Sequence, residues 1–275
     1  MALRLRTAVE AEVAGSEAVG AELRRRQVAG CRLHDAWRRR SVRMSAMKIL
    51  AIETSTDFGT CALWQDGVLE QRICPSGRPH SETLLPMLRD LVADAGIGFN
   101  QLDGIAFGAG PGAFTGLRIA CAVAQGVAVG TDLPLVPVCG LEAMAESVGE
   151  DRVVSLLDAR MGEVYLAAYE LRPAGHEPLG EIRLGLPAFL ELPAGEGWVA
   201  CGNAPAAYPA LAGRLLDAGI RLLPGILPQA DAVARLAARR LRHGGGIDPA
   251  LAAPLYVRDK VARTIDERLG SGGKA

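Results

Sequence analysis

The fold is decided by the stretch Lys48-Ile-Leu-Ala-Ile-Glu-Thr-Ser-Thr-Asp-Phe-Gly-Thr-Cys-Ala-Leu-Trp-Gln65, which continues through Asp66-Gly67 into Val68-Leu-Glu-Gln-Arg-Ile-Cys74. The mostly apolar runs at 49–54 and 60–65 predict two strands. Asp66-Gly67 is a two-residue hairpin signal, and the residues after it, 68–74, predict a third strand. We therefore expect the domain to open with three antiparallel strands.

Helices and strands alternate after this hairpin. Ser81 stands at an expected N-cap, and apolar residues recur at helical spacing up to Gly96, at positions 84, 85, 88, 91 and 92. The elements that follow are a strand at 102–107, a glycine-rich turn at 108–112, a helix at about 114–129, a strand at 134–138 and a short helix at 141–148.

The same order returns in weaker form in the second half. Two strands are predicted at 153–157 and 163–171, joined by Asp158-Ala-Arg-Met-Gly162, and a third at 198–202. Apolar residues at helical spacing then predict helices around 208–215 and 232–241. Repetition of this order predicts a two-lobed α/β protein with mixed sheets and flanking helices, of the actin and sugar-kinase type. We expect a first lobe at 47–150 and a smaller second lobe and tail at 151–275.

Composition excludes several classes of protein. The chain has 275 residues, 49% of them hydrophobic, and a formal net charge of −1, which are globular rather than fibrous or disordered values. Its six cysteines contain no Cys-x-x-Cys pair and indicate reduced thiols and a cytoplasmic protein. No apolar run reaches the roughly 18–20 residues that a membrane span needs, so we expect no membrane association.

Residues 1–46 differ in charge from the rest of the chain. They hold ten arginines against five acidic residues, whereas the remaining 229 residues hold 20 basic and 26 acidic residues. Met44 and Met47 stand just before the first strand, so we expect the natural start there and treat the upstream residues as a misplaced start or a disordered extension. The alternative is a basic arm that contacts RNA through Arg24–Arg26 and Arg38–Arg40.

The turn Gly108-Ala-Gly-Pro-Gly112 lies between a strand and a helix, where amide groups can hold a phosphate. It matches neither the Rossmann fingerprint nor the P-loop, so a tight turn is the competing interpretation. Glu53, Thr54 and Ser55 stand at the end of the first strand and are candidates for a vestigial nucleotide-binding turn, although no glycine there allows a close approach.

The helix after the glycine-rich turn carries a ridge of small residues, at positions 112, 116, 120, 124 and 128. Such a ridge allows another helix to approach closely. Because the helix is apolar almost all round, we expect its second face to be covered either by a helix of this chain or by a partner subunit.

The sequence holds few groups of residues that could bind a metal or carry out catalysis. His80 has Leu84 where a second metal ligand would stand one turn later, and there is no His-Glu-x-x-His or Gly-x-Ser-x-Gly motif. We therefore expect no metal and no catalytic residue. For Arg160 and Glu163, the simplest expectation is an ion pair across their hairpin turn.

Over residues 47–258 the chain resembles the bacterial TsaB (YeaZ) family. The resemblance lies in five stretches that keep the family's order: Ile49-Leu-Ala-Ile-Glu-Thr-Ser55, His80-Ser-Glu-Thr-Leu-Leu-Pro86, Phe107-Gly-Ala-Gly-Pro-Gly-Ala-Phe-Thr-Gly-Leu-Arg118, Asp158-Ala-Arg-Met-Gly-Glu-Val-Tyr165 and Pro254-Leu-Tyr-Val-Arg258. The glycine-rich stretch 107–118 and the stretch 158–165 are specific to the family. Two departures stand out: Ala113 where serine is usual and Glu53 where aspartate is common.

The resemblance implies an actin/sugar-kinase-like (ASKHA) fold with ribonuclease-H-like lobes, and a non-catalytic subunit for threonylcarbamoylation of the adenosine next to the anticodon of tRNAs. Such a subunit binds the catalytic paralogue TsaD, and with it the ATPase TsaE, and meets tRNA indirectly through the complex. It has no cofactor of its own, and ATP or ADP is expected only at the interface with the partners. Partner binding is implied for Gly110, Pro111, Gly112, Phe114, Thr115, Gly116, Leu117, Arg118, Ala120 and Ala124.

Two questions stay open at this point. A ridge that fits a paralogue also fits a second copy of this chain, so a homodimer is an alternative to the heterodimer. The competing functional class is an enzyme of the same fold, either an ATP-dependent transferase or a metalloprotease-like protein, although the core is short for a kinase of this fold and lacks the ligands for a metal.

Overall fold

The computed structural model describes residues 47–65 and 67–258. The expectations for residues 1–46, including the misplaced start and the basic arm, lie outside these residues.

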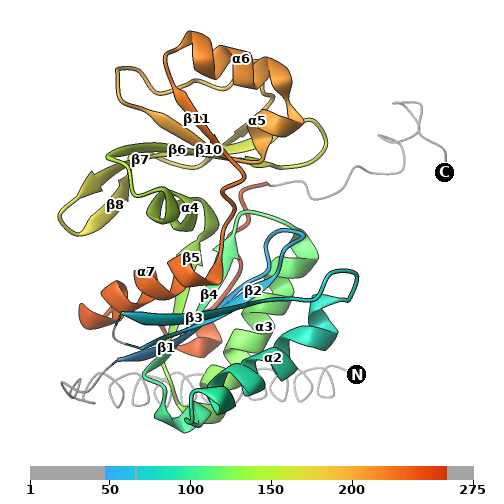
Figure 1. Cartoon of the computed structure of the whole chain (residues 1–275), viewed down its shortest axis with the longest axis vertical. Coiled ribbons are helices and arrows are strands. Elements are labelled where there is room, and N and C mark those ends of the chain that lie inside the picture. The colour runs from blue at the N-terminus through green and yellow to red at the C-terminus, as the bar shows by residue number, and fades with distance from the viewer. Residues whose placement is uncertain (1–46, 66, 259–275) are drawn as a thin grey trace, which may run out of the picture. The chain divides into compact units, whose positions relative to one another are not determined.

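The first sheet has five strands (Figure 1). They are β1 (Lys48–Glu53), β2 (Thr60–Gln65), β3 (Val68–Ile73), β4 (Gly104–Gly110) and β5 (Leu135–Cys139), in the order β3-β2-β1-β4-β5. The first three strands are antiparallel, and β4 and β5 run parallel to β1. The expected opening hairpin is therefore confirmed.

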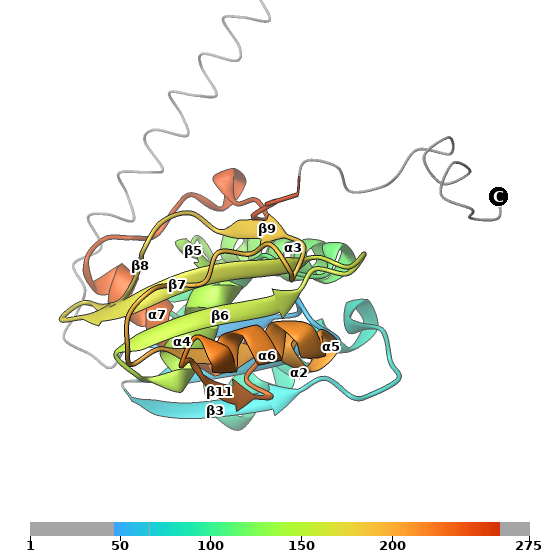
Figure 2. The same cartoon turned by 90° about the horizontal axis from the view of Figure 1, so that it is seen from above.

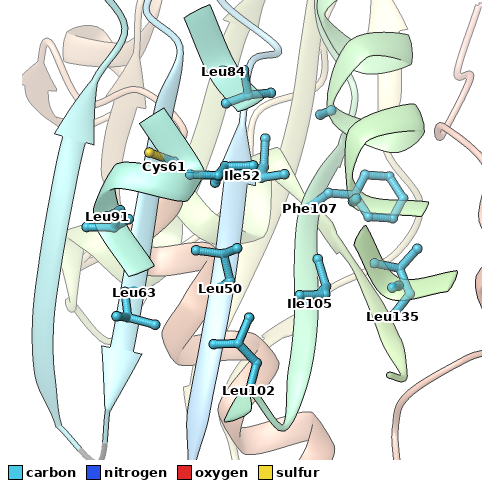
Figure 3. Packing of buried hydrophobic residues seen from close by; sticks show 14 of the residues in the cluster. Leu50, Ile52, Cys61, Leu63, Leu84, Leu91, Leu102, Ile105, Phe107 and Leu135 are labelled. Carbon is cyan, nitrogen blue, oxygen red and sulfur yellow. The ribbon is translucent and has the colours of Figure 1, made fainter. Parts of the chain in front are cut away.

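Helices cover both faces of this sheet. On one face, α2 (His80–Asp94) and α3 (Phe114–Thr131) bury a cluster that includes Leu50, Phe107 and Leu135 (Figure 3). A short 3-10 turn, η1 (Phe99–Gln101), connects α2 to β4. On the other face, α7 (Ala230–Arg242) packs on alternate residues of the same strands. Burial on both faces explains why β1 and β4 are almost continuously apolar.

The second sheet repeats this topology (Figure 2). Its strands are β6 (Arg152–Asp158), β7 (Val164–Arg172), β8 (Gly175–Pro178), β9 (Arg183–Gly185), β10 (Val199–Gly202) and β11 (Arg221–Pro224). The order is β8-β7-β6-β10-β11, with β9 beside β7, so a hairpin edge again adjoins parallel strands. This confirms the two-lobed α/β prediction.

The second sheet is also covered on both faces. Helices α5 (Ala204–Ala207) and α6 (Pro209–Asp217) bury one cluster, and α4 (Gly140–Val148) buries the other. In this lobe the non-helical segment 186–198 precedes β10, where the other lobe has helix α2 before β4.

Contacts cross the expected division at residue 150, because each lobe sends its last helix to the other lobe. Helix α4 follows β5 but packs on β6 and β7, whereas α7 follows β11 and packs on β1 and β2. The two helices also contact each other (Figure 1). Arg239 and Arg240 of α7 pair with Glu146 and Glu142 of α4, each at 2.5 Å. The lobes are thus joined by exchanged helices and not by a linker alone.

Several predicted boundaries also move. Strand β4 begins at Gly104 instead of the expected residue 102, and it includes the first glycines of the expected turn. Helix α2 begins at His80, with Pro79 as its N-cap instead of Ser81. Helix α3 runs two residues further than expected, to Thr131. Within the described part of the chain, α3 is the one helix long and apolar enough for a membrane span, and it packs on β4 of the first sheet.

Candidate functional site

The stretches that carry the family resemblance meet at one end of the two sheets. Glu53 ends β1, Gly110 ends β4, and Asp158 ends β6, so the loops after these strands gather at the carboxyl ends of parallel strands. The segment that leads to Arg258 returns to the same place. In open α/β sheets this is the end at which ligands and partners bind.

Glu53 is the most unusual residue of this region. Its side chain is fully buried, and its Oε1 accepts a hydrogen bond from the Ser55 amide at 2.5 Å. Its Oε2 has no hydrogen-bond partner and lies above Gly108, where an added Cβ would overlap it. Burial raises the pKa of this carboxyl, and the hydrogen bonds from Ser55 lower it by less.

Thr54 and Ser55 hold the start of α3. The Thr54 hydroxyl donates to the carbonyl of Gly116 at 2.7 Å, and the Ala113 amide donates to the carbonyl of Ser55 at 2.7 Å. Two amides of this region, those of Ser55 and Ala113, are thus bonded within the chain, and Glu53 adds a buried carboxyl beside them. The geometry of Glu53, Thr54 and Ser55 does not fit a phosphate at this turn.

The ridge of small residues has a different role from the one that we expected. Gly116, Ala120 and Ala124 are fully or almost fully buried on the first sheet, and a Cβ at Gly112 or Gly116 would overlap backbone atoms of the 54–55 turn. The ridge is therefore internal packing, and a partner helix cannot reach it. Gly110, Pro111 and Leu117 are also buried.

The opposite face of α3 is the exposed one. It presents Phe114, Thr115, Arg118, Ala122, Gly126 and Val129. Val129 is 68% exposed, and nothing lies within 4 Å of a Cβ added at Gly126. Three of the predicted partner-binding residues, Phe114, Thr115 and Arg118, belong to this exposed face. We call this set of six residues the outer face of α3.

A segment of the chain borders the outer face. In η2 (Pro249–Leu251) and just after it, the carbonyls of Pro249 and Ala252 accept hydrogen bonds from Gln125 at 2.8 and 3.2 Å. Arg118 lies 3.7 Å above the Phe114 ring and donates to the Tyr256 hydroxyl at 3.1 Å. A segment of this chain, rather than one of its α-helices, therefore covers one flank of α3.

The same segment reaches the hairpin after β6. Arg258 pairs with Glu163 and donates to the carbonyl of Ala159 at 3.2 Å. Arg160 pairs instead with Asp57 at 3.4 Å and Asp158 at 3.7 Å. The expected Arg160–Glu163 pair is wrong, because each residue has a partner from a distant part of the chain. Periodicity gives no sign of these contacts, and the Pro254–Arg258 stretch of the resemblance was the only available signal.

His80 begins α2, where its ring packs against Gly59 and Cys74 and its Nδ1 is buried without a hydrogen-bond partner. Within residues 47–65 and 67–258, no three His, Cys, Asp or Glu side chains are grouped so that they could hold a metal ion. The absence of a metal in the protein stays a prediction.

Comparison with known proteins extends the resemblance over the whole described region. The chain is 35% identical over 229 residues to the tRNA threonylcarbamoyladenosine biosynthesis protein TsaB of Escherichia coli, covering 78% of this chain and 96% of that protein. It is 41% identical over 128 residues to TsaB of Haemophilus influenzae, covering 45% of this chain and 54% of that protein.

Structures and family models agree with these relatives. The solved structure of YeaZ from Pseudomonas aeruginosa has a TM-score of 0.68 and 31% identity, covering 77% of this chain and all of that one. A second structure from the same organism, an uncharacterized protein similar to the peptidase YeaZ, has a TM-score of 0.69 and 32% identity over the same share of each chain. Residues 72–193 match the family model of TsaD, the tRNA N6-adenosine threonylcarbamoyltransferase. The chain belongs to the TsaB (YeaZ) family.

Proposed function

We propose that this chain is a non-catalytic subunit in the biosynthesis of threonylcarbamoyladenosine in tRNA, and that it binds the paralogue TsaD. The proposal is supported by its relatives, which are named as TsaB proteins of this biosynthesis. The observation that carries it is the outer face of α3, where the exposed apolar residues Phe114 and Val129 flank the small exposed residues Ala122 and Gly126.

The outer face suits a helix of a partner. Ala122 and Gly126 are four residues apart and present almost no side chain, so a second helix can approach closely there. Phe114 and Arg118 stand at one end of the face, and these residue types are enriched at the centres of protein interfaces. A second copy of this chain would meet the same face in the homodimer, which competes with the heterodimer.

The remaining roles follow from membership of a complex. The ATPase TsaE and tRNA are met through TsaD, and ATP or ADP belongs at the shared interface, because the 53–55 turn of this chain does not fit a phosphate. The working compartment is the cytoplasm. An enzyme of the same fold is the second candidate, but no arrangement of nucleophile, base or metal ligands in the described residues favours it.

The test uses Ala122→Arg in the full chain, with TsaD from the same cell. A long charged side chain at the centre of the outer face holds the helices apart or loses its hydration, so binding should fall about tenfold or more while the melting temperature stays unchanged. Ala210→Arg, at an exposed alanine of α6, is the matched control and should bind as the wild type does.

Titration by calorimetry measures the affinity, and gel filtration of the isolated chain measures self-association. If Ala122→Arg binds TsaD as tightly as Ala210→Arg does, the outer face is not the docking surface. If the wild-type chain does not bind TsaD at all, the proposed function is wrong.

A further inference from the structure

Glu53 is a fully buried carboxyl without a cation partner. Among the described residues, no lysine, arginine or histidine pairs with it, and Oε2 has no hydrogen-bond partner at all. An unpaired buried carboxylate is very costly, and a side chain in this position avoids the cost by keeping its proton.

The elements packed around Glu53 supply no compensating charge. Strands β2, β4 and β5 contain no acidic or basic residue, and their only titratable groups are Cys61 and Cys139. On α4 and α7, Asp231 pairs with Arg235, and Glu142 and Glu146 pair with arginines of α7. Arg118 of α3 donates to the Tyr256 hydroxyl, and the His80 ring at the start of α2 lies beside Gly59. Asp57, in the loop beyond Ser55, pairs with Arg160.

One nearby group acts in the opposite direction. The amide of Ala230, in the first turn of α7, donates to the Thr60 hydroxyl at 2.9 Å, and Thr60 lies directly opposite Glu53 on β2. The partial positive charge of that helix end favours a carboxylate. Burial acts the other way and is the largest influence on the pKa of Glu53, which it raises.

Glu53 is connected to the start of α3 by two hydrogen bonds in series. Its Oε1 accepts from the Ser55 amide, and the Ser55 carbonyl accepts from the amide of Ala113, the N-cap of α3. Ala113 has no side-chain oxygen, so no side chain caps this helix. The end of α3 that carries Phe114 and Arg118 thus depends on the 53–55 turn for its position.

We propose that Glu53 is a neutral carboxylic acid in the folded protein, and that losing its proton loosens the start of α3, which makes this end of the outer face a proton-sensitive element. The proton is carried on Oε2, because Oε1 accepts the Ser55 hydrogen bond. Ionisation leaves a carboxylate that can be hydrated only if the 53–55 turn moves outward from Gly108. The Ser55–Ala113 and Thr54–Gly116 hydrogen bonds then weaken together.

The test compares the full-length wild type with Glu53→Gln, which keeps the size of the acid and cannot ionise. A group whose pKa is raised by folding contributes stability that is fully present below its unfolded pKa and is lost as the pH rises through the folded pKa. The melting temperature of the wild type should therefore fall relative to that of Glu53→Gln as the pH rises from 5 upward, with Glu53→Gln higher by at least about 3 °C at pH 8.

Glu146→Gln is the matched control, because this carboxyl is also largely buried but pairs with Arg239. Its burial raises its pKa, and the hydrogen bond and charge of Arg239 outweigh that effect and lower it overall. Its stability contribution is present above its unfolded pKa and is lost in acid, so Glu146→Gln should melt below the wild type at pH 8. An infrared band of a protonated carboxyl, present in the wild type and absent in Glu53→Gln, identifies the proton directly.

Hydrogen exchange of the peptide 107–118 reports the start of α3. It should speed up in the wild type at alkaline pH beyond the intrinsic effect of pH, and it should not do so in Glu53→Gln. The proposal is overturned if Glu53→Gln melts below the wild type at every pH, if the infrared band is absent from the wild type, or if exchange is the same in both proteins.

The proposal concerns the docking surface assigned above and so rests on the proposed function for its biological meaning, but these three measurements need no partner. If all three succeed and TsaD does not bind, the proton-sensitive element stands and the proposed function falls.

Discussion

Replacing Ala120 by Arg is expected to abolish the folded state. Ala120 is fully buried between α3 and the first sheet, in the cluster that contains Phe107 and Leu50. No acidic residue belongs to that cluster, so the guanidinium would be buried without a counter-ion or would separate α3 from the sheet. Either result costs several kcal/mol, about as much as the entire stability of an ordinary domain, which is roughly 5–15 kcal/mol.

Circular dichroism and the soluble yield of Ala120→Arg measure this outcome, with Ala122→Arg as the control on the same helix. The two positions are two residues apart, carry the same side chain, and differ in that Ala122 is exposed. Ala122→Arg should fold normally. A folded Ala120→Arg with an unchanged melting temperature would show that α3 is not packed on the sheet by its ridge.

The two alanines also show what the sequence could establish about the site. The spacing at 112, 116, 120 and 124 correctly predicts that one face of the helix is in close contact with something. It does not say whether that contact is the sheet beneath the helix or a partner above it, because α3 carries small residues on both faces. Only the burial of Gly116, Ala120 and Ala124 decides this.

The fold was more predictable than the site, because its evidence is local and repeated. The order of elements can be read from local signals: Asp66-Gly67 marks the turn between two hairpin strands, and a single apolar stripe marks a helix. The exchange of α4 and α7 between the lobes was not predictable, since both are amphipathic helices that fit either sheet equally well by pattern. The ion pairs that join the two helices, Glu146 with Arg239 and Glu142 with Arg240, connect residues almost a hundred positions apart.

Contacts at the carboxyl ends of the strands show the same limit. Glu53 could be identified as the end of a strand, but the sequence does not place the strands and helices that separate it from the cations of residues 47–65 and 67–258. Tyr256 and Arg258 lie in a segment without regular structure, so no periodicity marks their contacts with Arg118 and Glu163.

Gly116→Ala is expected to lower the free energy of unfolding by about 2–4 kcal/mol, a large effect for a single methyl group. The added Cβ would overlap the carbonyl oxygen of Thr54, which is backbone and cannot rotate away. The 54–55 turn would have to move, and the hydrogen bond from the Thr54 hydroxyl to the Gly116 carbonyl would be strained with it. The melting temperature should fall by at least about 5 °C.

Gly126→Ala is the matched control, because it makes the same change on the same helix where nothing lies within 4 Å of the new Cβ. Alanine is a better helix former than glycine, so this variant should gain about 0.5–1 kcal/mol and melt slightly above the wild type. Thermal and urea unfolding of both variants measure the difference. Equal stabilities would mean that the 54–55 turn does not touch α3 at Gly116, and the path from Glu53 to the start of this helix would then be broken at its last step.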